Sequence, residues 1–467
     1  MTEGADDGLR RLVRRHRREF IDHLAEWVRI PSIAGDPEHA DALPRSANHL
    51  AGLCRTTGFP RVEVWQQGDT SSVFAEWRAD ASAPTVLVYS HHDVRAVIGE
   101  PWRETDPFTP VERDGCLFGR GASDAKGQVI AHLWGLRALL TDGSAPPVTL
   151  KLFIDGEEEL GSLSLAGLLE ERAADLACDL IVYSDTTLLD PGRPAVTTSV
   201  RGMIGAELTV FGPEYDVHSG AVSGPSPNPV VDLAALVGRL HDADGRVTLP
   251  GFYDAVTTPT PAQREEYAAL GVDDDWWLEE SGTARVAGER GYSVPELLWA
   301  RPALEVISIK GGDLEGLPRA VIPASATASI SIRLVDGQTP EAVAGQLERW
   351  VEAKARGIRT ELSIQRKSAE APYRTPDHPA VEALDKAMRV GFGVDTVGRM
   401  GNAGGGPAEL LARTLAAPLV FFGTGLVSDR WHASDERARL DVLERGATTL
   451  AAFWPRLAAT LAGRTSE

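Results

Sequence analysis

The feature that most constrains this chain is the regular alternation of short apolar strands with helices in its first 185 residues. Strands are predicted at 62–65, 73–78, 85–90, 148–154 and 180–184. Helices, with apolar residues at helical spacing, are predicted at 7–29, 45–58, 128–140 and 163–174. Because strands that alternate with helices form a mostly parallel sheet covered on both faces, the sequence predicts a doubly wound α/β domain.

A different pattern occupies residues 197–370. It reads strand, helix, strand, strand, helix, strand, at 198–211, 228–240, 304–310, 326–334, 339–355 and 360–366. That order is typical of a ferredoxin-like α+β domain. The α/β pattern resumes with helices at 379–390 and 441–461 and a strand at 416–422. We therefore expect residues 1–196 and 371–467 to form one domain that residues 197–370 interrupt.

The composition narrows the classes of partner. Lys and Arg total 47 against 67 Asp and Glu, and the formal net charge of -20 argues against nucleic-acid binding and against adhesion to anionic membranes. No stretch sustains the apolar length of a membrane span, and the N-terminus has no apolar signal region. Three widely spaced cysteines fit a reducing compartment. These features predict a cytoplasmic protein with a small-molecule partner.

Candidate metal ligands follow the predicted strands directly. His91 and Asp93 end one strand, the acidic residues 157–159 follow another, and Asp185 follows a third. The carboxyl ends of strands in such a sheet border its ligand crevice, so these side chains are expected to converge. A glycine-rich turn at 119–127 presents one further carboxylate, Asp124.

A two-metal hydrolase needs a bridging carboxylate, flanking His and carboxylate ligands, and a free carboxylate that moves protons. The residues that can supply the ligands are His91, Asp124, Glu159, Asp185 and His432. Asp93 can hold the second nitrogen of the His91 ring. Mixed His and carboxylate ligation suits Zn, Mn or Co.

Other interpretations of these motifs have less support in the sequence. Taken singly, a strand-end His, an acidic triplet or a glycine-rich turn is more often structural; the gathering of several acids after apolar strands favours cations that offset their repulsion. A serine hydrolase lacks support because no G-x-S-x-G elbow is present. The 119–127 turn fails as a phosphate loop because Asp124 stands where the second glycine belongs. A metal-free scaffold of the same fold stays open as the non-enzymatic alternative.

The order of these motifs resembles the M20 metallopeptidases, and most closely their cytosolic dipeptidase and carnosinase-like members. The motifs that carry the resemblance are His91-His92-Asp93, Gly119 to Gly127, Gly156 to Ser162, Tyr183-Ser184-Asp185, His218-Ser219-Gly220, Val321-Ile322-Pro323, Ser331 to Val335 and Trp431-His432. The resemblance spans nearly the whole chain. It implies a catalytic domain interrupted by a lid domain through which two chains form a homodimer.

The resemblance also implies a ligand set for two divalent ions, of which zinc is the leading candidate and Mn or Co the alternatives. One ion would be held by His91, Asp124 and Asp185. The other would be held by Asp124, Glu159 and His432. The family often has a cis peptide bond after the bridging Asp, so we expect one between Asp124 and Ala125.

Further roles are implied by the same resemblance. Glu158 matches the general base and Asp93 the acid that orients the ligand His. His218 resembles a residue that reaches into the partner subunit's site to stabilise the oxyanion, and Arg333 one that binds the substrate carboxylate. His378 resembles a substrate-site His of some relatives, although helix capping or a surface position suits it equally well.

The predicted reaction is hydrolysis of the peptide bond of dipeptides or short peptides. Two positions depart from the family pattern: Ala320 precedes the Val-Ile-Pro motif where relatives usually have Asn or Thr, and Gly406 ends a Gly-Gly turn that relatives close with Ser or Thr. Each departure removes a hydrogen-bond donor that would face substrate. Such a loss would weaken the binding of a substrate carboxylate or of the oxyanion. Among enzymes, the alternative is an amidohydrolase acting on N-acyl amino acids or carbamoyl-type amides.

Overall fold

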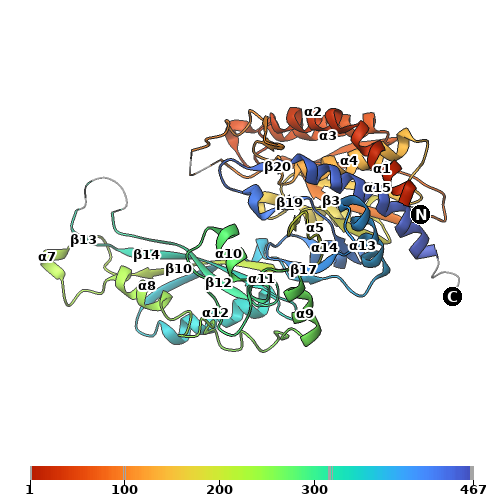
Figure 1. Cartoon of the computed structure of the whole chain (residues 1–467). Helices are drawn as coiled ribbons and strands as arrows, with labels where there is room; N and C mark the ends of the chain where they lie inside the picture. The colour runs from red at the N-terminus through yellow and green to blue at the C-terminus, as the bar shows by residue number, and fades with distance from the viewer. Residues whose placement is uncertain (1–2, 98, 100, 314–316, 318, 463–467) are drawn as a thin grey trace. The chain divides into compact units, whose positions relative to one another are not determined.

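The computed structural model describes residues 3–97, 99, 101–313, 317 and 319–462, and the chain divides into two compact units. The first unit comprises residues 1–199, 374–402 and 407–467. The second unit comprises residues 200–373 and 403–406. Figure 1 traces the chain through both, from red at the N-terminus to blue at the C-terminus.

The first unit is built on a six-stranded sheet with the order β1-β2-β6-β3-β7-β18. Its strands are β1 (Arg61–Gln67), β2 (Thr70–Trp77), β3 (Thr85–His91), β6 (Thr149–Asp155), β7 (Leu180–Tyr183) and β18 (Leu419–Phe421). The four strands β6, β3, β7 and β18 run parallel, whereas β2 pairs antiparallel with both β1 and β6. The predicted α/β sheet is confirmed, with an antiparallel edge.

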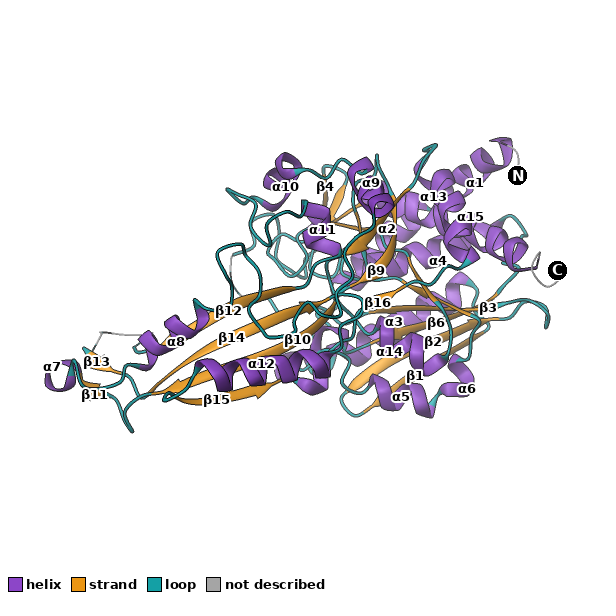
Figure 2. Cartoon of the chain, turned by 90° about the horizontal axis from the view of Figure 1, so that it is seen from below, coloured by secondary structure: helices purple, strands orange, loops and turns teal. Residues whose placement is uncertain are grey.

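Helices of the first unit bury large apolar side chains against this sheet and against one another. The principal helices are α1 (Glu3–Arg15), α2 (Arg17–Val28), α3 (Ala42–Thr57), α4 (Lys126–Thr141), α13 (Pro379–Phe392) and α15 (Leu440–Ala462). Helix α15 packs against α13, α4 and α1, as Figure 2 also shows. Trp27, Trp134 and Trp454 are fully buried in the resulting core. None of the described helices has both the length and the apolar character that a membrane span requires.

Three predicted elements are each divided in two in the structure. The helix expected at 163–174 is broken at Arg172 into α5 (Leu165–Glu171) and α6 (Ala173–Leu176). The helix expected at 7–29 is broken at His16 into α1 and α2, and the apolar spacing continues across the break, so periodicity alone does not locate it. The strand expected at 198–211 is two strands, β9 (Ala195–Val200) and β10 (Gly202–Phe211). They belong to different sheets, because β9 pairs with β16 (Tyr373–Arg374) and β17 (Gly398–Asn402).

The second unit contains an antiparallel sheet with the order β12-β14-β10-β15. The other strands are β12 (Ala303–Gly311), β14 (Ser325–Leu334) and β15 (Arg359–Ile364), and the packed helices are α8 (Pro229–Val237) and α12 (Pro340–Lys354). Residues of β14 alternate between buried and half-buried, which places one face of the sheet on the core. Strand order and connections confirm the ferredoxin-like pattern.

The segment 242–302, which the sequence left without an interpretation, contains three short helices. They are α9 (Pro261–Ala269), α10 (Asp274–Ser281) and α11 (Val294–Trp299). A buried ion pair between Glu289 and Arg301, at 2.8 Å, links the end of this segment to the turn before α11. The segment is therefore folded, with polar contacts that sequence periodicity does not reveal.

Candidate metal centre

The parallel strands of the first unit deliver their polar residues to one edge of the sheet. Strand β3 ends at His91, which lies opposite Asp155, the last residue of β6. Glu158 and Glu159 follow β6 in the short helix η2 (Glu158–Leu160), and Asp185 lies two residues beyond β7. The side chains of His91, Glu159 and Asp185 are all buried. The strand-end residues singled out in the sequence are thus neighbours in the fold.

Asp124 lies between two imidazole rings. Its Oδ1 atom is 3.2 Å from Nε2 of His91, and its Oδ2 atom is 3.0 Å from Nε2 of His432. His432 also approaches Glu159, with 3.3 Å between Nε2 and Oε2. Each oxygen of Asp124 therefore faces a different histidine.

The turn that carries Asp124 requires glycine at two positions. Gly119 and Gly121 have φ values of 152° and 86°, in the region that favours glycine. A Cβ atom on Gly119 would also lie 2.6 Å from Cγ1 of Val28. The peptide bond between Asp124 and Ala125 is cis, which confirms the prediction made for it.

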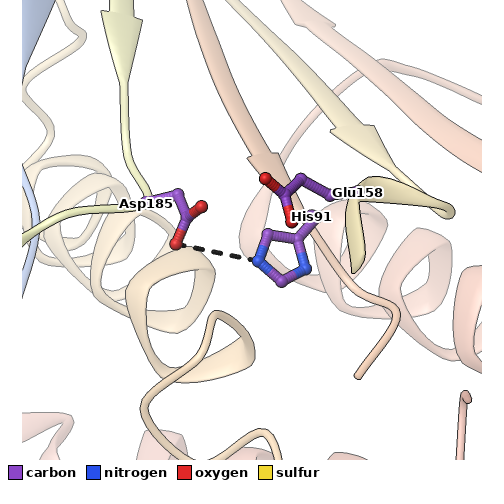
Figure 3. Close-up of side chains that lie close together, drawn as sticks. All are labelled: His91, Glu158 and Asp185. Atoms are coloured by element: carbon purple, nitrogen blue, oxygen red, sulfur yellow. Dashed lines mark ion pairs between the residues drawn. The ribbon is translucent and has the colours of Figure 1, made fainter. Parts of the chain in front are cut away.

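Within the described part of the chain, two groups of three side chains place ligand-type atoms within 4.8 Å of one another. One is His91, Glu158 and Asp185, shown in Figure 3 with the 3.7 Å ion pair between His91 and Asp185 drawn as a dashed line. The other is Asp124, Glu159 and His432. Together the two groups contain all five residues predicted as metal ligands, and also Glu158, which was predicted as the general base.

Asp93 connects the end of β3 to the acidic turn after β6. Its Oδ1 atom lies 3.3 Å from Nδ1 of His91. Its two carboxylate oxygens accept hydrogen bonds from the backbone amides of Glu158 at 3.2 Å and Glu159 at 3.0 Å. One buried carboxylate thus orients both the His91 ring and the turn that follows β6.

The charged groups of the site shift one another's pKa values strongly. Burial lowers the pKa of His91, but the carboxylates of Asp185, Asp124 and Asp93 outweigh burial and hold it well above its usual value. For His432, hydrogen bonds with Asp124 and Glu159 likewise overcome burial and raise the pKa to about 10. Burial raises the pKa of Asp185 despite the favourable charge of His91. In this arrangement the protonated imidazoles of His91 and His432 supply positive charge that stabilises the buried carboxylates.

The donor set fits divalent cations. Oε1 of Glu159 and Oδ1 of Asp185 are buried oxygens without a hydrogen-bond partner among the described residues, although Oδ1 of Asp185 also forms the 3.7 Å ion pair with His91. Such orphaned acceptors are costly unless a cation or donor satisfies them. Imidazole nitrogen and carboxylate oxygen suit Zn, Mn or Co. A metal requires the imidazoles in their neutral form, so it would replace the protons described above.

The remaining predicted residues, His218, Arg333 and His378, belong to other elements of the chain. His218 ends β11 (Val217–His218) and Arg333 lies near the end of β14, so both belong to the second unit. His378 is in the first unit, where its Nδ1 accepts a hydrogen bond from the amide of Ala380 at 3.2 Å and caps α13. Capping was one of the alternatives considered for it. Of the positions that depart from the family pattern, Ala320 has φ 54° and Gly406 φ 148°.

Sequence reasoning did not single out Glu436 and Asp429, two buried acids that contact the Asp124 turn. Asp429 accepts a hydrogen bond from the Ser123 hydroxyl at 2.7 Å, and Trp431 donates its indole N–H to the same hydroxyl at 2.8 Å. The available signal was weak, because each acid is an ordinary charged residue in the loop around His432.

An α/β unit that gathers His91 from a strand end, His432 from a loop and several buried carboxylates at one site is typical of metal-dependent hydrolases. Residues 87–456 match peptidase family M20/M25/M40. The chain belongs to this family, and the prediction of a metallopeptidase that resembles the M20 dipeptidases is confirmed.

Proteins similar to this chain align with it over nearly the whole of both sequences. The chain is 28% identical to a Beta-Ala-His dipeptidase of Rattus norvegicus, with 96% of this chain and 95% of the relative aligned. It is 28% identical to a Cys-Gly metallodipeptidase of Schizosaccharomyces pombe, over 94% and 96% of the two chains. The structure of human carnosine dipeptidase 1 superposes on this one with a TM-score of 0.84 at 28% sequence identity. The superposition covers 97% of this chain and 99% of the human chain. The relatives' names agree with the dipeptidase-like expectation.

Proposed function

We propose that this protein hydrolyses the peptide bond of dipeptides with two divalent ions that share Asp124. The observation that carries this proposal is the position of the Asp124 carboxylate, with Oδ1 facing His91 and Oδ2 facing His432. A bridging carboxylate between two His-containing ligand groups is the arrangement that two-metal hydrolysis requires. The dipeptidase names of full-length relatives support the substrate class.

We assign one ion to His91, Asp124 and Asp185 and the other to Asp124, Glu159 and His432. Zinc is the leading candidate for both, and Mn and Co are the alternatives. When bound, such ions polarise the scissile carbonyl and make an attacking water more acidic.

Glu158 is the proposed general base. It lies beside the proposed ligands His91 and Asp185, with ligand-type atoms of the three within 4.8 Å. In this role the Glu158 carboxylate takes a proton from the attacking water and later gives it to the leaving amine. The backbone amide of Glu158 donates a 3.2 Å hydrogen bond to Oδ1 of Asp93. This contact fixes the backbone of Glu158 and so helps to orient its side chain.

The second unit is the proposed lid and dimerisation domain, for which the sequence suggests residues 197–370. We assign His218 to stabilisation of the oxyanion in the site of a partner subunit, and Arg333 to binding of the substrate carboxylate. Arg333 is half-buried, and its pKa is lowered by burial although Glu370 opposes this effect. A guanidinium partly removed from water suits bidentate binding of a carboxylate. His378, already engaged as a helix cap, is the weaker substrate-site candidate.

A cytoplasmic location is proposed on the basis of cysteine chemistry. Cys54, Cys116 and Cys178 are all free thiols. Disulfides are rare in reducing compartments, where free thiols are the usual state.

A substrate comparison tests the proposed function. The enzyme is stripped with a chelator, and hydrolysis of β-Ala-His, Cys-Gly and other unblocked dipeptides is compared with hydrolysis of N-acetyl amino acids after addition of Zn or Mn. We expect activity that depends on the added metal and prefers the unblocked dipeptides. Preference for the acetylated set would favour the amidohydrolase alternative, and absence of metal-dependent hydrolysis would favour the scaffold.

A further inference from the structure

The side chain of Glu436 is enclosed completely and makes four hydrogen bonds, all to the turn that carries Asp124. Its exposed fraction is 0%. The Oε1 atom accepts hydrogen bonds from three backbone amides, those of Gly121 at 3.0 Å, Ser123 at 3.1 Å and Asp124 at 3.1 Å. The Oε2 atom accepts a hydrogen bond from Arg120 at 2.6 Å. One carboxylate therefore holds the conformation of the whole turn.

The same residue also fixes the segment that leaves His432. Glu436 lies four residues after His432, and its own carbonyl accepts a hydrogen bond from the amide of Gly119 at 2.9 Å. Directly after it, β20 (Arg437–Arg439) pairs antiparallel with β5 (Cys116–Phe118), which leads into the turn. The backbone and the side chain of Glu436 thus join the turn of Asp124 to the loop of His432.

Only an ionised carboxylate can make this set of contacts. Three amides and a guanidinium are all donors, and a carboxylate is an acceptor at both oxygens. A glutamine of the same shape would place an NH₂ group against either the amides or Arg120, leaving donors opposed in a buried site. Replacement of Glu436 should therefore loosen the Asp124 turn.

We propose that Glu436 is a positioning residue that holds Asp124 and His432 at the spacing required by the ion they share. The inference rests on the proposed ligand roles of these two residues. Glu436 has no assigned contact with metal or substrate, and acts through the backbone of the turn and through the loop that follows His432. Residues that orient metal ligands typically contribute about 10- to 100-fold in metal affinity or activity.

The test compares Glu436→Gln and Glu436→Asp with Glu289→Gln. Glu289 is a matched control, because it is also a buried acid and pairs with Arg301 in the second unit. Metal affinity is measured by calorimetric titration of Zn into the metal-free protein, and thermal stability is recorded for each metal-free variant. We expect Glu436→Gln to bind Zn about 10- to 100-fold more weakly, with Glu436→Asp intermediate. Glu289→Gln should lose stability but keep wild-type Zn affinity.

Wild-type Zn affinity in Glu436→Gln, with stability lowered as in the control, would overturn the positioning role.

Hydrogen exchange and a variant of Asp124 complete the test. If the Glu436 variants do not fold, hydrogen exchange of the metal-free wild-type protein replaces them: the amides of Gly121, Ser123 and Asp124 should be protected, and rapid exchange at all three would overturn the inference. Asp124→Asn separates the two proposals, since wild-type Zn binding in that variant would refute the ligand assignment itself.

Discussion

Nε2 of His432 lies 3.0 Å from Oδ2 of Asp124, although these residues come from opposite halves of the sequence. On the other side of the same carboxylate, Oδ1 faces His91 at 3.2 Å. The consequence is that one side chain belongs to both proposed ligand groups. Changes at Asp124 should affect both ions, whereas changes at either histidine should affect mainly one.

Replacement of Glu158 by Gln should separate catalysis from metal binding. The amide cannot accept the proton of the attacking water, so kcat should fall by about 100-fold or more, which is the usual contribution of a general base. Metal content, measured by elemental analysis of the dialysed protein, should stay at the wild-type value.

The neighbouring Glu157→Gln variant is the control for this experiment. Glu157 accepts hydrogen bonds from the amide and hydroxyl of Ser164 through its Oε1 atom, an interaction that glutamine retains. Its kcat should remain close to wild type. Wild-type turnover in Glu158→Gln would show that another group moves the proton.

Metal affinity should increase with pH. Hydrogen bonds to Asp124 and Glu159 outweigh burial and raise the pKa of His432 to about 10, so the metal-free protein carries a proton on His432 at neutral pH. A ligand imidazole must be neutral, so binding of Zn displaces this proton. Below the pKa of His432, the apparent Zn affinity should therefore rise about tenfold for each unit of pH. Titration of Zn in two buffers with different ionisation enthalpies should reveal proton release. Affinity that is constant between about pH 6.5 and 9 would contradict this account.

The same raised pKa gives a stability prediction of definite sign. The folded-state pKa of His432 lies above the value of about 6.5 expected in the unfolded chain. Its contribution to the stability of the metal-free protein is therefore complete below about pH 6.5 and is lost as the pH rises towards 10. The melting temperature of wild type relative to His432→Gln should decline over that range. A constant difference would argue that His432 is neutral without metal.

The proposed role of His218 predicts complementation between two inactive variants. His218→Ala and Glu158→Gln should each have low activity alone. If His218 acts in the partner's site, a mixed dimer contains one intact site, formed by Glu158 of one chain and His218 of the other. Random exchange of equal amounts should restore about a quarter of wild-type activity, because half of the dimers are mixed and half of their sites are complete. Activity that stays at the level of the separate variants would indicate that His218 acts within its own chain or not at all.

The sequence predicted the fold well where local pattern and tertiary structure agree. The strands ending at His91 and Asp155, and the ferredoxin-like order of the second unit, follow from alternation and apolar runs. The break at His16 was missed because the apolar stripe continues from α1 into α2. The helices of segment 242–302 were missed because that segment is organised partly by buried polar pairs such as Glu289 with Arg301.

The residues proposed as metal ligands could be picked out from the sequence, but the contacts that hold them in place could not. Strand ends and the glycine turn indicated His91 and Asp124 from the sequence, whereas the grouping with His432 depended on family resemblance. Glu436 could not be found in this way, because its importance comes from three backbone amides that are distant in sequence and adjacent in space. Hydrogen bonds to backbone amides do not depend on a recognisable residue pattern.

The most direct test of the central claim is the number of metal ions bound by wild-type protein and by Asp124→Asn, measured by elemental analysis after equilibration with Zn. If Asp124 is shared, wild type should bind two ions per chain, and the variant should lose affinity for both together with dipeptide hydrolysis. A single ion in the wild type, or two ions with undiminished affinity in the variant, would contradict the shared-carboxylate site.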